Sequence, residues 1–308
     1  MIAVIDIGTN TFHLLIAKIV DEENYQIVFR ESIFVRIAKD GIDPISPKSL
    51  ERAINTLSHF VKTMESYEIT HLRVVGTEAL RSASNGHELI ELAKNQLGLS
   101  IEIITGEEEA RLIFEGTAHA IPAYKSPYLI MDIGGGSVEF ILANSGKIIW
   151  WGSYKIGVQY LFLQYHKDPF PVESVDALKI ELNTILADLK QQIEKHKPTR
   201  LVGSSGSFET LASLAELSND ENYVVIPTNH FDEIFKNIVS SSHNDRLENP
   251  SIPDDRAELI VIGFLLVEHI LSLFNAEEII VSAYALREGL LYSNEKYGKI
   301  NTAYSKVT

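Results

Sequence analysis

Two segments of this chain, 126 positions apart (132 minus 6), carry the same order of chemical groups. In each, an apolar run delivers an aspartate (Asp6 or Asp132), and a short stretch rich in Gly and hydroxyls (8–11 or 134–137) leads into a second apolar run. Such a turn presents backbone N–H groups around a concavity that suits a phosphate, and the aspartate can hold a divalent cation through water. One copy would be an ordinary hairpin. Two copies in register indicate two similar domains facing one phosphate-bearing ligand.

Three acids in a row, Glu107, Glu108 and Glu109, follow Thr105, which fits the first position of a helix capping box. The positive end of the helix dipole favours ionised carboxylates there. Glu109 also begins an inward-facing stripe at helical spacing, which continues through Ile113, Gly116 and Ala120. A charged Glu109 could orient and deprotonate a water. The alternative is that the acids only offset the dipole. We favour this dipole role for Glu107 and Glu108, and Glu107 could also pair with Arg111. For Glu109 the residues alone leave both interpretations open.

Two further side chains are candidates for chemistry. Glu139 stands seven residues after Asp132, in the register that His13 has in the first copy, and strand alternation sends it to the face opposite Val138. A solvent-facing glutamate is the alternative. Arg81 follows a predicted strand end, where a guanidinium could grip phosphate oxygens in a bidentate manner, although a surface salt bridge would also explain it. Weaker candidates of the same type are Arg36, Arg256 and Arg287.

Composition narrows the class of protein. At 308 residues the chain is long enough for two domains, and no cysteine is present, so thiolate sites and disulfides are excluded. A net charge of −15 argues against nucleic-acid binding and requires local arginines or cations around a phosphate. The N-terminus lacks a basic segment, and the apolar stretch 259–274 is interrupted by Glu268 and His269. We therefore expect a buried helix, no membrane span, and a location in the cytoplasm.

The elements that position these residues follow one order twice: three strands, helix, strand, helix, strand, helix. In the first half we expect strands near 2–7, 12–19, 25–30, 71–76 and 101–104, an extended piece near 33–38, and helices near 47–66, 84–97 and 106–121. In the second half we expect strands near 127–133, 138–143, 147–153, 200–203 and 277–281, and helices before 195 and near 206–217, 229–241, 255–274 and 284–296. Residues 244–255 are expected to form a surface loop.

This pattern indicates a mixed sheet covered by helices, present twice. The expected domains are 1–122 and 123–308, with a C-terminal helix at about 284–308 packing back on the first domain.

Paired phosphate loops on duplicated units of this kind are typical of the actin-like, Hsp70-like and sugar-kinase-like superfamily. Within it, the chain resembles the exopolyphosphatase and guanosine pentaphosphate phosphatase family over essentially its whole length. The matching segments are 6–11, 76–83, 106–114, 132–139, 203–207, 255–257 and 282–290. The resemblance implies an α/β fold of two duplicated ribonuclease H-like domains with a cleft between them.

The resemblance also implies roles for individual residues. Glu109 matches the general base, Glu139 a second acid near metal and water, and Arg81 a phosphate-binding arginine. The metal candidates are Asp132, Asp6 and Glu139, with Mg²⁺ or Mn²⁺ as cofactor and K⁺ as a further candidate. The expected phosphate ligands are Gly8, Thr9, Asn10, Thr11, Gly134, Gly135, Gly136, Ser137, Gly203, Ser204, Gly206 and Ser207.

The chain departs from the family pattern at two positions of one loop and in length. Ser205 stands where the family usually has Gly, and Ser207 where it usually has Thr. The long members carry a C-terminal helical extension, and this chain resembles the short form without it.

The predicted activity is metal-dependent hydrolysis of the terminal phosphoanhydride of inorganic polyphosphate, releasing orthophosphate. Guanosine pentaphosphate presents the same terminal bond and is the first alternative substrate. A kinase of the same fold is a second alternative, which the Glu-rich helix start disfavours. A non-catalytic polyphosphate or nucleotide sensor is a third, and it has no need of Glu109. The expected partners are the substrate and, as an open possibility, a second copy of the chain in a homodimer.

Overall fold

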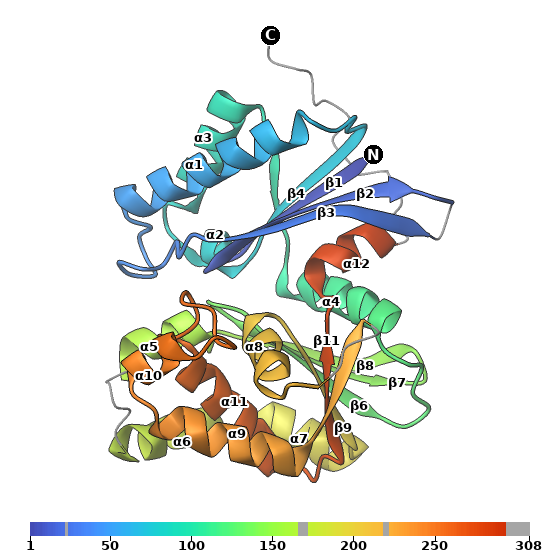
Figure 1. Cartoon of the computed structure of the whole chain (residues 1–308), viewed down its shortest axis with the longest axis vertical. Helices are drawn as coiled ribbons and strands as arrows, with labels where there is room; N and C mark the ends of the chain where they lie inside the picture. Colours follow the sequence, from blue (N-terminus) through green and yellow to red (C-terminus); the bar gives the residue numbers. More distant parts are fainter. Residues whose placement is uncertain (22–23, 166–171, 218–221, 294–308) are drawn as a thin grey trace. The chain divides into compact units, whose positions relative to one another are not determined.

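The computed structural model of the protein describes residues 1–21, 24–165, 172–217 and 222–293. The chain divides into two compact units, Met1–Gly116 with Leu286–Thr308, and Thr117–Ala285 (Figure 1). The division falls within helix α4 (Gly106–Ala120). Of the C-terminal helix expected at 284–308, the structure describes α12 (Leu286–Tyr292), which packs on strand β1 of the first unit. Residues 294–308 lie outside the described residues.

The first unit is built on a five-stranded mixed sheet in the order β3-β2-β1-β4-β5. Its strands are β1 (Ile2–Ile7), β2 (Thr11–Ile19), β3 (Tyr25–Phe34), β4 (His71–Gly76) and β5 (Ile101–Ile103). The first three are antiparallel neighbours, and β4 and β5 continue the sheet parallel to β1. The extended piece expected near 33–38 is therefore in part the end of β3, which pairs with β2 through Phe34.

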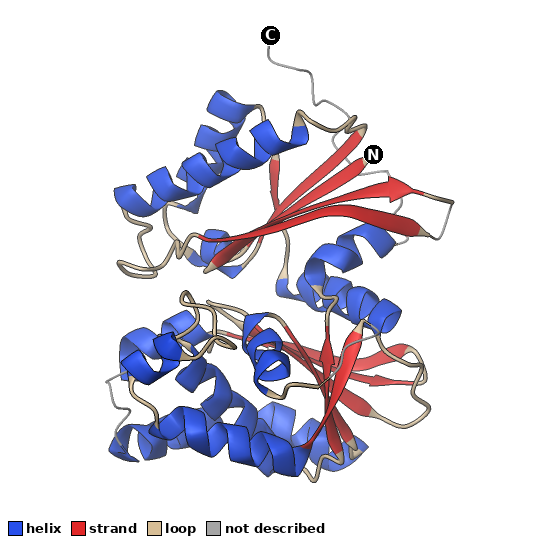
Figure 2. Ribbon diagram, in the orientation of Figure 1, coloured by secondary structure: helices blue, strands red, loops and turns tan. Residues whose placement is uncertain are grey.

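Helices cover both faces of this sheet. Helices α1 (Pro47–Met64) and α3 (Gly86–Leu97) pack together on one face, and α12 lies on the other (Figure 2). Ser46 caps α1 by accepting from the Ser49 N–H, as the Ser-Pro pair predicts. Alternate residues of β1 and β2 meet the apolar stripe of α1 in the core. These are Ala3, Ile5, Ile7, Phe12, Leu14 and Ile16 on the strands, and Leu50, Ala53, Leu57, Phe60 and Met64 on the helix.

The second unit repeats the sheet and adds a strand, in the order β10-β11-β9-β6-β7-β8. Its strands are β6 (Tyr128–Ile133), β7 (Val138–Asn144), β8 (Lys147–Tyr154), β9 (Arg200–Ser204), β10 (Tyr223–Pro227) and β11 (Glu278–Ser282). Strands β8-β7-β6-β9-β11 correspond to β3-β2-β1-β4-β5, so the predicted duplication of a ribonuclease H-like unit is confirmed. Strand β10, antiparallel to β11, was not predicted.

The helices of the second unit enclose a very apolar central helix, α11 (Ile260–Leu273), which is buried along most of its length. Around it lie α5 (Val158–Tyr165), α6 (Val172–Ile185), α8 (Gly206–Leu214) and α9 (Thr228–Ser240). Helix α7 (Ala187–His196) precedes β9. No helix among the described residues is both long and apolar enough to pass through a membrane. The apolar run near 259–274 is thus a core helix, as predicted.

Three local expectations differ from the structure. Part of the expected loop at 244–255 is helix α10 (His243–Glu248), which Ser242 and Asp245 cap reciprocally. The helix expected from 255 starts at Ile260, because residues 254–259 form turns. A short helix, α2 (Glu78–Ser82), follows β4 where none was expected. Each difference involves a segment of seven residues or fewer, too short for a periodic pattern to register.

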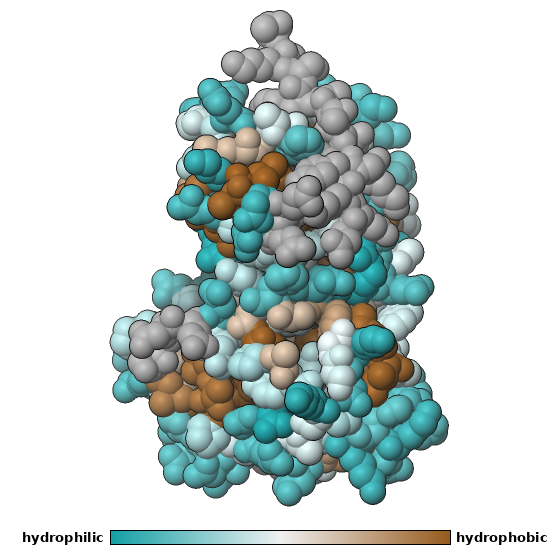
Figure 3. Space-filling view, turned by 90° about the vertical axis from the view of Figure 1, so that its right-hand side faces the viewer, coloured by the Kyte–Doolittle hydropathy of each residue, from teal (hydrophilic) through white to brown (hydrophobic). Residues whose placement is uncertain are grey.

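The side that Figure 3 shows is mostly polar, with apolar residues gathered in places. The edge strand β8 contributes to the exposed apolar side chains through Ile149 and Trp151.

Candidate active site

The two Gly-rich turns have the same geometry. The Gly8 N–H donates to the Thr11 carbonyl at 3.1 Å, and the Gly134 N–H donates to the Ser137 carbonyl at 3.0 Å. A Cβ atom at either glycine would lie within 2.9 Å of that same carbonyl oxygen. Both positions therefore require glycine for close backbone approach, as the repeated sequence predicts.

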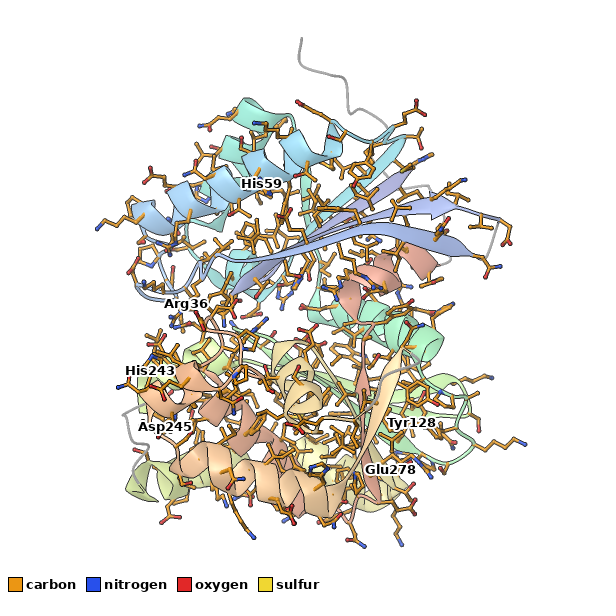
Figure 4. All side chains as sticks on the ribbon, viewed as in Figure 1. Arg36, His59, Tyr128, His243, Asp245 and Glu278 are labelled. Atoms are coloured by element: carbon orange, nitrogen blue, oxygen red, sulfur yellow. The ribbon has the colours of Figure 1, made fainter. Side chains whose placement is uncertain are left out.

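The carbonyl groups of the first turn are tied to the segment that follows β3. The N–H groups of residues 35–37 donate to the Thr9 and Asn10 carbonyls at 2.8 to 2.9 Å. Arg36 lies in this segment with a positive φ of 49° (Figure 4). Arg52 of α1 holds the segment from behind, donating to the Val35 and Arg36 carbonyls at 3.0 and 2.8 Å.

A different element ties down the second turn. The N–H groups of residues 157–160, at the start of α5, donate to the carbonyls of 134–136 at 2.9 to 3.3 Å. Gly157 lies so close that a Cβ atom there would sit 2.4 Å from the Gly135 carbonyl. In both turns the carbonyl groups thus accept hydrogen bonds from a neighbouring segment of the same unit.

The N–H groups in the middle of each turn, unlike its carbonyl groups, make no hydrogen bonds within the described residues. Within the described part of the chain, no hydrogen bond is donated by the N–H groups of Thr9, Asn10, Gly135 or Gly136. The side-chain amide of Asn10 is also buried, at 4% exposure, with neither Oδ1 nor Nδ2 bonded to a described group. Buried polar groups are nearly always hydrogen-bonded, so this arrangement suits an oxygen-rich ligand such as a phosphate.

Polar residues form a row across the second sheet. Ser204, Asp132, Glu139 and Ser153 are register neighbours on β9, β6, β7 and β8. Side chains in register lie on the same face, so the two carboxylates are adjacent. Glu139 is 1% exposed, which excludes the solvent-facing alternative, and it accepts from the Ser153 hydroxyl at 2.7 Å. Asp132 Oδ2 accepts from the hydroxyls of Ser204 at 2.5 Å and Ser205 at 2.8 Å.

The equivalent row in the first sheet has a histidine where the second sheet has the glutamate Glu139. Asp6 is in register with His13, which is in register with Ser32. His13 Nδ1 lies 2.7 Å from the Ser32 hydroxyl and 3.1 Å from a guanidinium nitrogen of Arg287 on α12. Arg287 is in turn 2.9 Å from Glu288, which is fully buried. The weak candidate Arg287 therefore belongs to a structural network that holds α12 on the sheet.

Glu109 is buried in the first turn of α4 and is bound to Arg81. Its Oε2 accepts from Arg81 Nη1 at 3.1 Å. Arg81 also donates to the Ile104 carbonyl at 2.8 Å, and to Glu78 Oε2 from Nε at 3.1 Å and from Nη2 at 2.6 Å. Glu78 is nine-tenths buried and was not among the predicted site residues. Its spacing of three residues from Arg81 would have been a signal only if the short helix α2 had been predicted.

Burial works against the charge of Arg81, yet Glu109 and Glu78 together raise the pKa of its guanidinium above the ordinary value. Four of its five N–H groups are used in these bonds. Arg81 therefore fixes the orientation of the Glu109 carboxylate, while its contact with a phosphate stays a prediction.

The two neighbouring acids differ in their surroundings. Glu107 is exposed. Glu108 lies 2.9 Å from Arg73 and 3.7 Å from Arg111, and its N–H donates to the Thr105 hydroxyl at 3.2 Å. The sequence offered Glu107 as a partner for Arg111, and the ion pair that the structure shows is with Glu108.

The loop at 203–207 connects β9 to α8. The Phe208 ring packs directly against Gly203, and a Cβ atom at this position would lie 2.0 Å from a ring carbon. A Cβ on Gly206 would lie 2.2 Å from the Arg256 guanidinium, so this arginine packs against the start of α8. Arg256 Nε also lies 4.0 Å from an Asp255 carboxylate oxygen, so a local ion pair contributes to its placement.

No three His, Asp or Glu residues in the described ranges gather closely enough to hold a metal ion by themselves. The row of Asp132 and Glu139 fits a cation such as Mg²⁺, which binds through one or two carboxylates and takes its other ligands from water and substrate phosphates.

Comparisons with known proteins agree with this geometry. The model of the Ppx/GppA phosphatase family matches residues 15–298. A Haemophilus influenzae protein provisionally named an exopolyphosphatase is 29% identical over 300 residues, covering 96% of this chain and 91% of its own. The crystal structure of an exopolyphosphatase from Cytophaga hutchinsonii is 36% identical with a TM-score of 0.91, covering 94% of this chain and 96% of its own. The Aquifex aeolicus PPX-GPPA enzyme is 26% identical with a TM-score of 0.77, covering 94% and 98%. With this match over nearly its whole length, the chain belongs to the Ppx/GppA phosphatase family and is a phosphohydrolase.

Proposed function

We propose that this protein hydrolyses the terminal phosphoanhydride bond of inorganic polyphosphate and releases orthophosphate. The observation that carries the proposal is the buried Glu109 carboxylate, fixed by Arg81 at 3.1 Å. A carboxylate held in one orientation can take a proton from water as the water attacks a terminal phosphorus in line. The names of the relatives from Haemophilus influenzae and Cytophaga hutchinsonii support polyphosphate as the substrate class.

The Gly-rich turns would hold the phosphate groups. Their inner N–H groups, from Thr9, Asn10, Gly135 and Gly136, donate to no other described group and would bind phosphate oxygens. Charge building up on those oxygens in the transition state would be stabilised without reorganisation, because the carbonyls of the same turns are already anchored.

Of the two aspartates predicted as metal ligands, Asp132 is the better candidate. Its register neighbour is Glu139, so two carboxylates lie together. The register neighbour of Asp6 is His13, which has the Arg287 guanidinium at 3.1 Å, and a positive group disfavours a second cation nearby. When bound, Mg²⁺ would neutralise phosphate charge at this row of residues. Asp132 and Glu139 would orient its water ligands.

The test is orthophosphate release from polyphosphate, guanosine pentaphosphate and ATP, each with Mg²⁺. We expect release from polyphosphate, and a Glu109→Gln variant slowed by at least 100-fold, the lower range for loss of a general base. Glu107→Gln, two residues away and exposed, is the matched control and should keep wild-type turnover. Turnover of Glu109→Gln at the wild-type rate would reject the proposed base. Release from guanosine pentaphosphate alone would reject polyphosphate as substrate, and no release from any substrate would favour a sensor.

A further inference from the structure

Ser205 has a backbone conformation that residues with a side chain rarely adopt. It lies between β9 and α8 with a φ of 71° and a ψ of −179°. This region is populated almost only by glycine, and a non-glycine residue held there is strained.

The Ser205 side chain does not perform the role usual for a serine at a helix start. A serine in the N-cap position normally accepts a hydrogen bond from the N–H two or three residues later. Ser205 occupies this position before α8, yet its hydroxyl makes no capping bond. The Phe208 and Glu209 N–H groups donate instead to the Ser205 carbonyl, each at 3.0 Å.

The hydroxyl is directed to Asp132. It donates to Oδ2 at 2.8 Å, beside the 2.5 Å bond from Ser204 to the same oxygen. Asp132 is 7% exposed, so its orientation is decided by such bonds and not by solvent. Two donors on one carboxylate oxygen restrict rotation of the carboxylate about its Cβ–Cγ bond.

We propose that Ser205 is a positioning residue for Asp132, acting through this hydroxyl at the cost of a strained backbone. The proposal deepens the proposed function, since it assigns a second donor to the carboxylate that would hold Mg²⁺. The competing explanation is that packing of Gly206 against Arg256 imposes the backbone conformation and the serine is merely tolerated. The two explanations differ in what loss of the hydroxyl does.

The strain is tested by comparing Ser205→Gly with Ser205→Ala, since both lose the hydroxyl and only alanine keeps a Cβ. We expect the Tm of Ser205→Gly to exceed that of Ser205→Ala by about 2–4 °C. The matched control is Ser213, an exposed residue inside α8, where alanine should give the higher Tm because glycine is unfavourable in a helix. The same order at both positions would overturn the claim of strain.

The positioning role is tested by the kinetics of the same two variants. We expect kcat for polyphosphate to fall about tenfold in both, as for loss of one hydrogen bond to a charged group, with KM changed less than twofold. The Mg²⁺ concentration for half-maximal activity should rise in both. A wild-type kcat in either variant would overturn the proposal. An inactive wild-type protein would reject the proposed function and leave the role of Ser205 to a calorimetric titration with Mg²⁺. We expect both variants to bind Mg²⁺ more weakly than the wild-type protein. Unchanged Mg²⁺ binding would overturn the positioning role.

Discussion

Replacement of Arg81 by methionine should destabilise the first unit more than any ordinary surface change. The variant leaves Glu78 and Glu109, whose side chains are 9% and 8% exposed, without the cation that contacts both. Two unit charges 4 Å apart interact by about 4 kcal/mol at an effective dielectric constant of 20. Removing one partner of a buried ion pair costs about 3–5 kcal/mol. Because Arg81 is itself 24% exposed, we expect a loss of about 3 kcal/mol in the free energy of unfolding.

Urea denaturation at pH 7 measures this loss, and a second variant identifies its cause. In Arg81→Met/Glu78→Gln one of the two carboxylate charges that Arg81 contacted is gone, so we expect about 1–2 kcal/mol to be recovered. The control is Arg111→Met, which removes a partly exposed pair of 3.7 Å and should cost less than about 1 kcal/mol. If the double variant were no more stable than Arg81→Met, the stabilisation would lie in packing of the arginine stem and the electrostatic reasoning would be wrong.

Two further predictions concern the second unit. Gly157→Ala should displace the second Gly-rich turn and lower kcat by at least tenfold, because the added Cβ would lie 2.4 Å from a backbone carbonyl of that turn. Measurements of phosphate release and of Tm check this prediction. Burial lowers the pKa of His269, helped by the nearby Lys179 and opposed by Glu268, so the unfolded state binds more protons below about pH 6.5. Stability should therefore fall between pH 6.5 and 5, and less so in His269→Leu, as urea denaturation at each pH would measure.

The duplicated fold could be predicted because its signals are local and occur twice. The apolar runs at 2–7 and 128–133, each ending near an aspartate, became β1 and β6, and the predicted order was correct for the strands that the two units share. Strand β10 was missed because it has no counterpart in the first half. Helix α10 was missed because its capping residues, Ser242 and Asp245, lie in a stretch whose Asn, Asp and Pro content is typical of a loop.

The site was predictable where it depends on register and not where it depends on tertiary contacts. The equivalence of His13 and Glu139 follows from counting residues after each aspartate, and both register pairs are confirmed. The bond between Arg81 and Glu109 joins residues 28 positions apart on different helices. No spacing rule reaches that far, so the sequence offered the arginine as a phosphate ligand or a salt-bridge partner without identifying Glu109 as the residue it binds.

The two Gly-rich turns show where the information in a repeated motif ends. The motif specifies the turn itself, since Gly8 and Gly134 meet the same carbonyl in the same way. It does not specify what anchors the turn, which is a segment with Arg36 at positive φ in one unit and the start of α5 with Gly157 in the other. Both anchors use backbone N–H groups to bind the turn carbonyls, so side-chain identity at the anchor is constrained only by conformation and space. A search for such sites by motif alone therefore finds the turn and misses the residues that keep its N–H groups available.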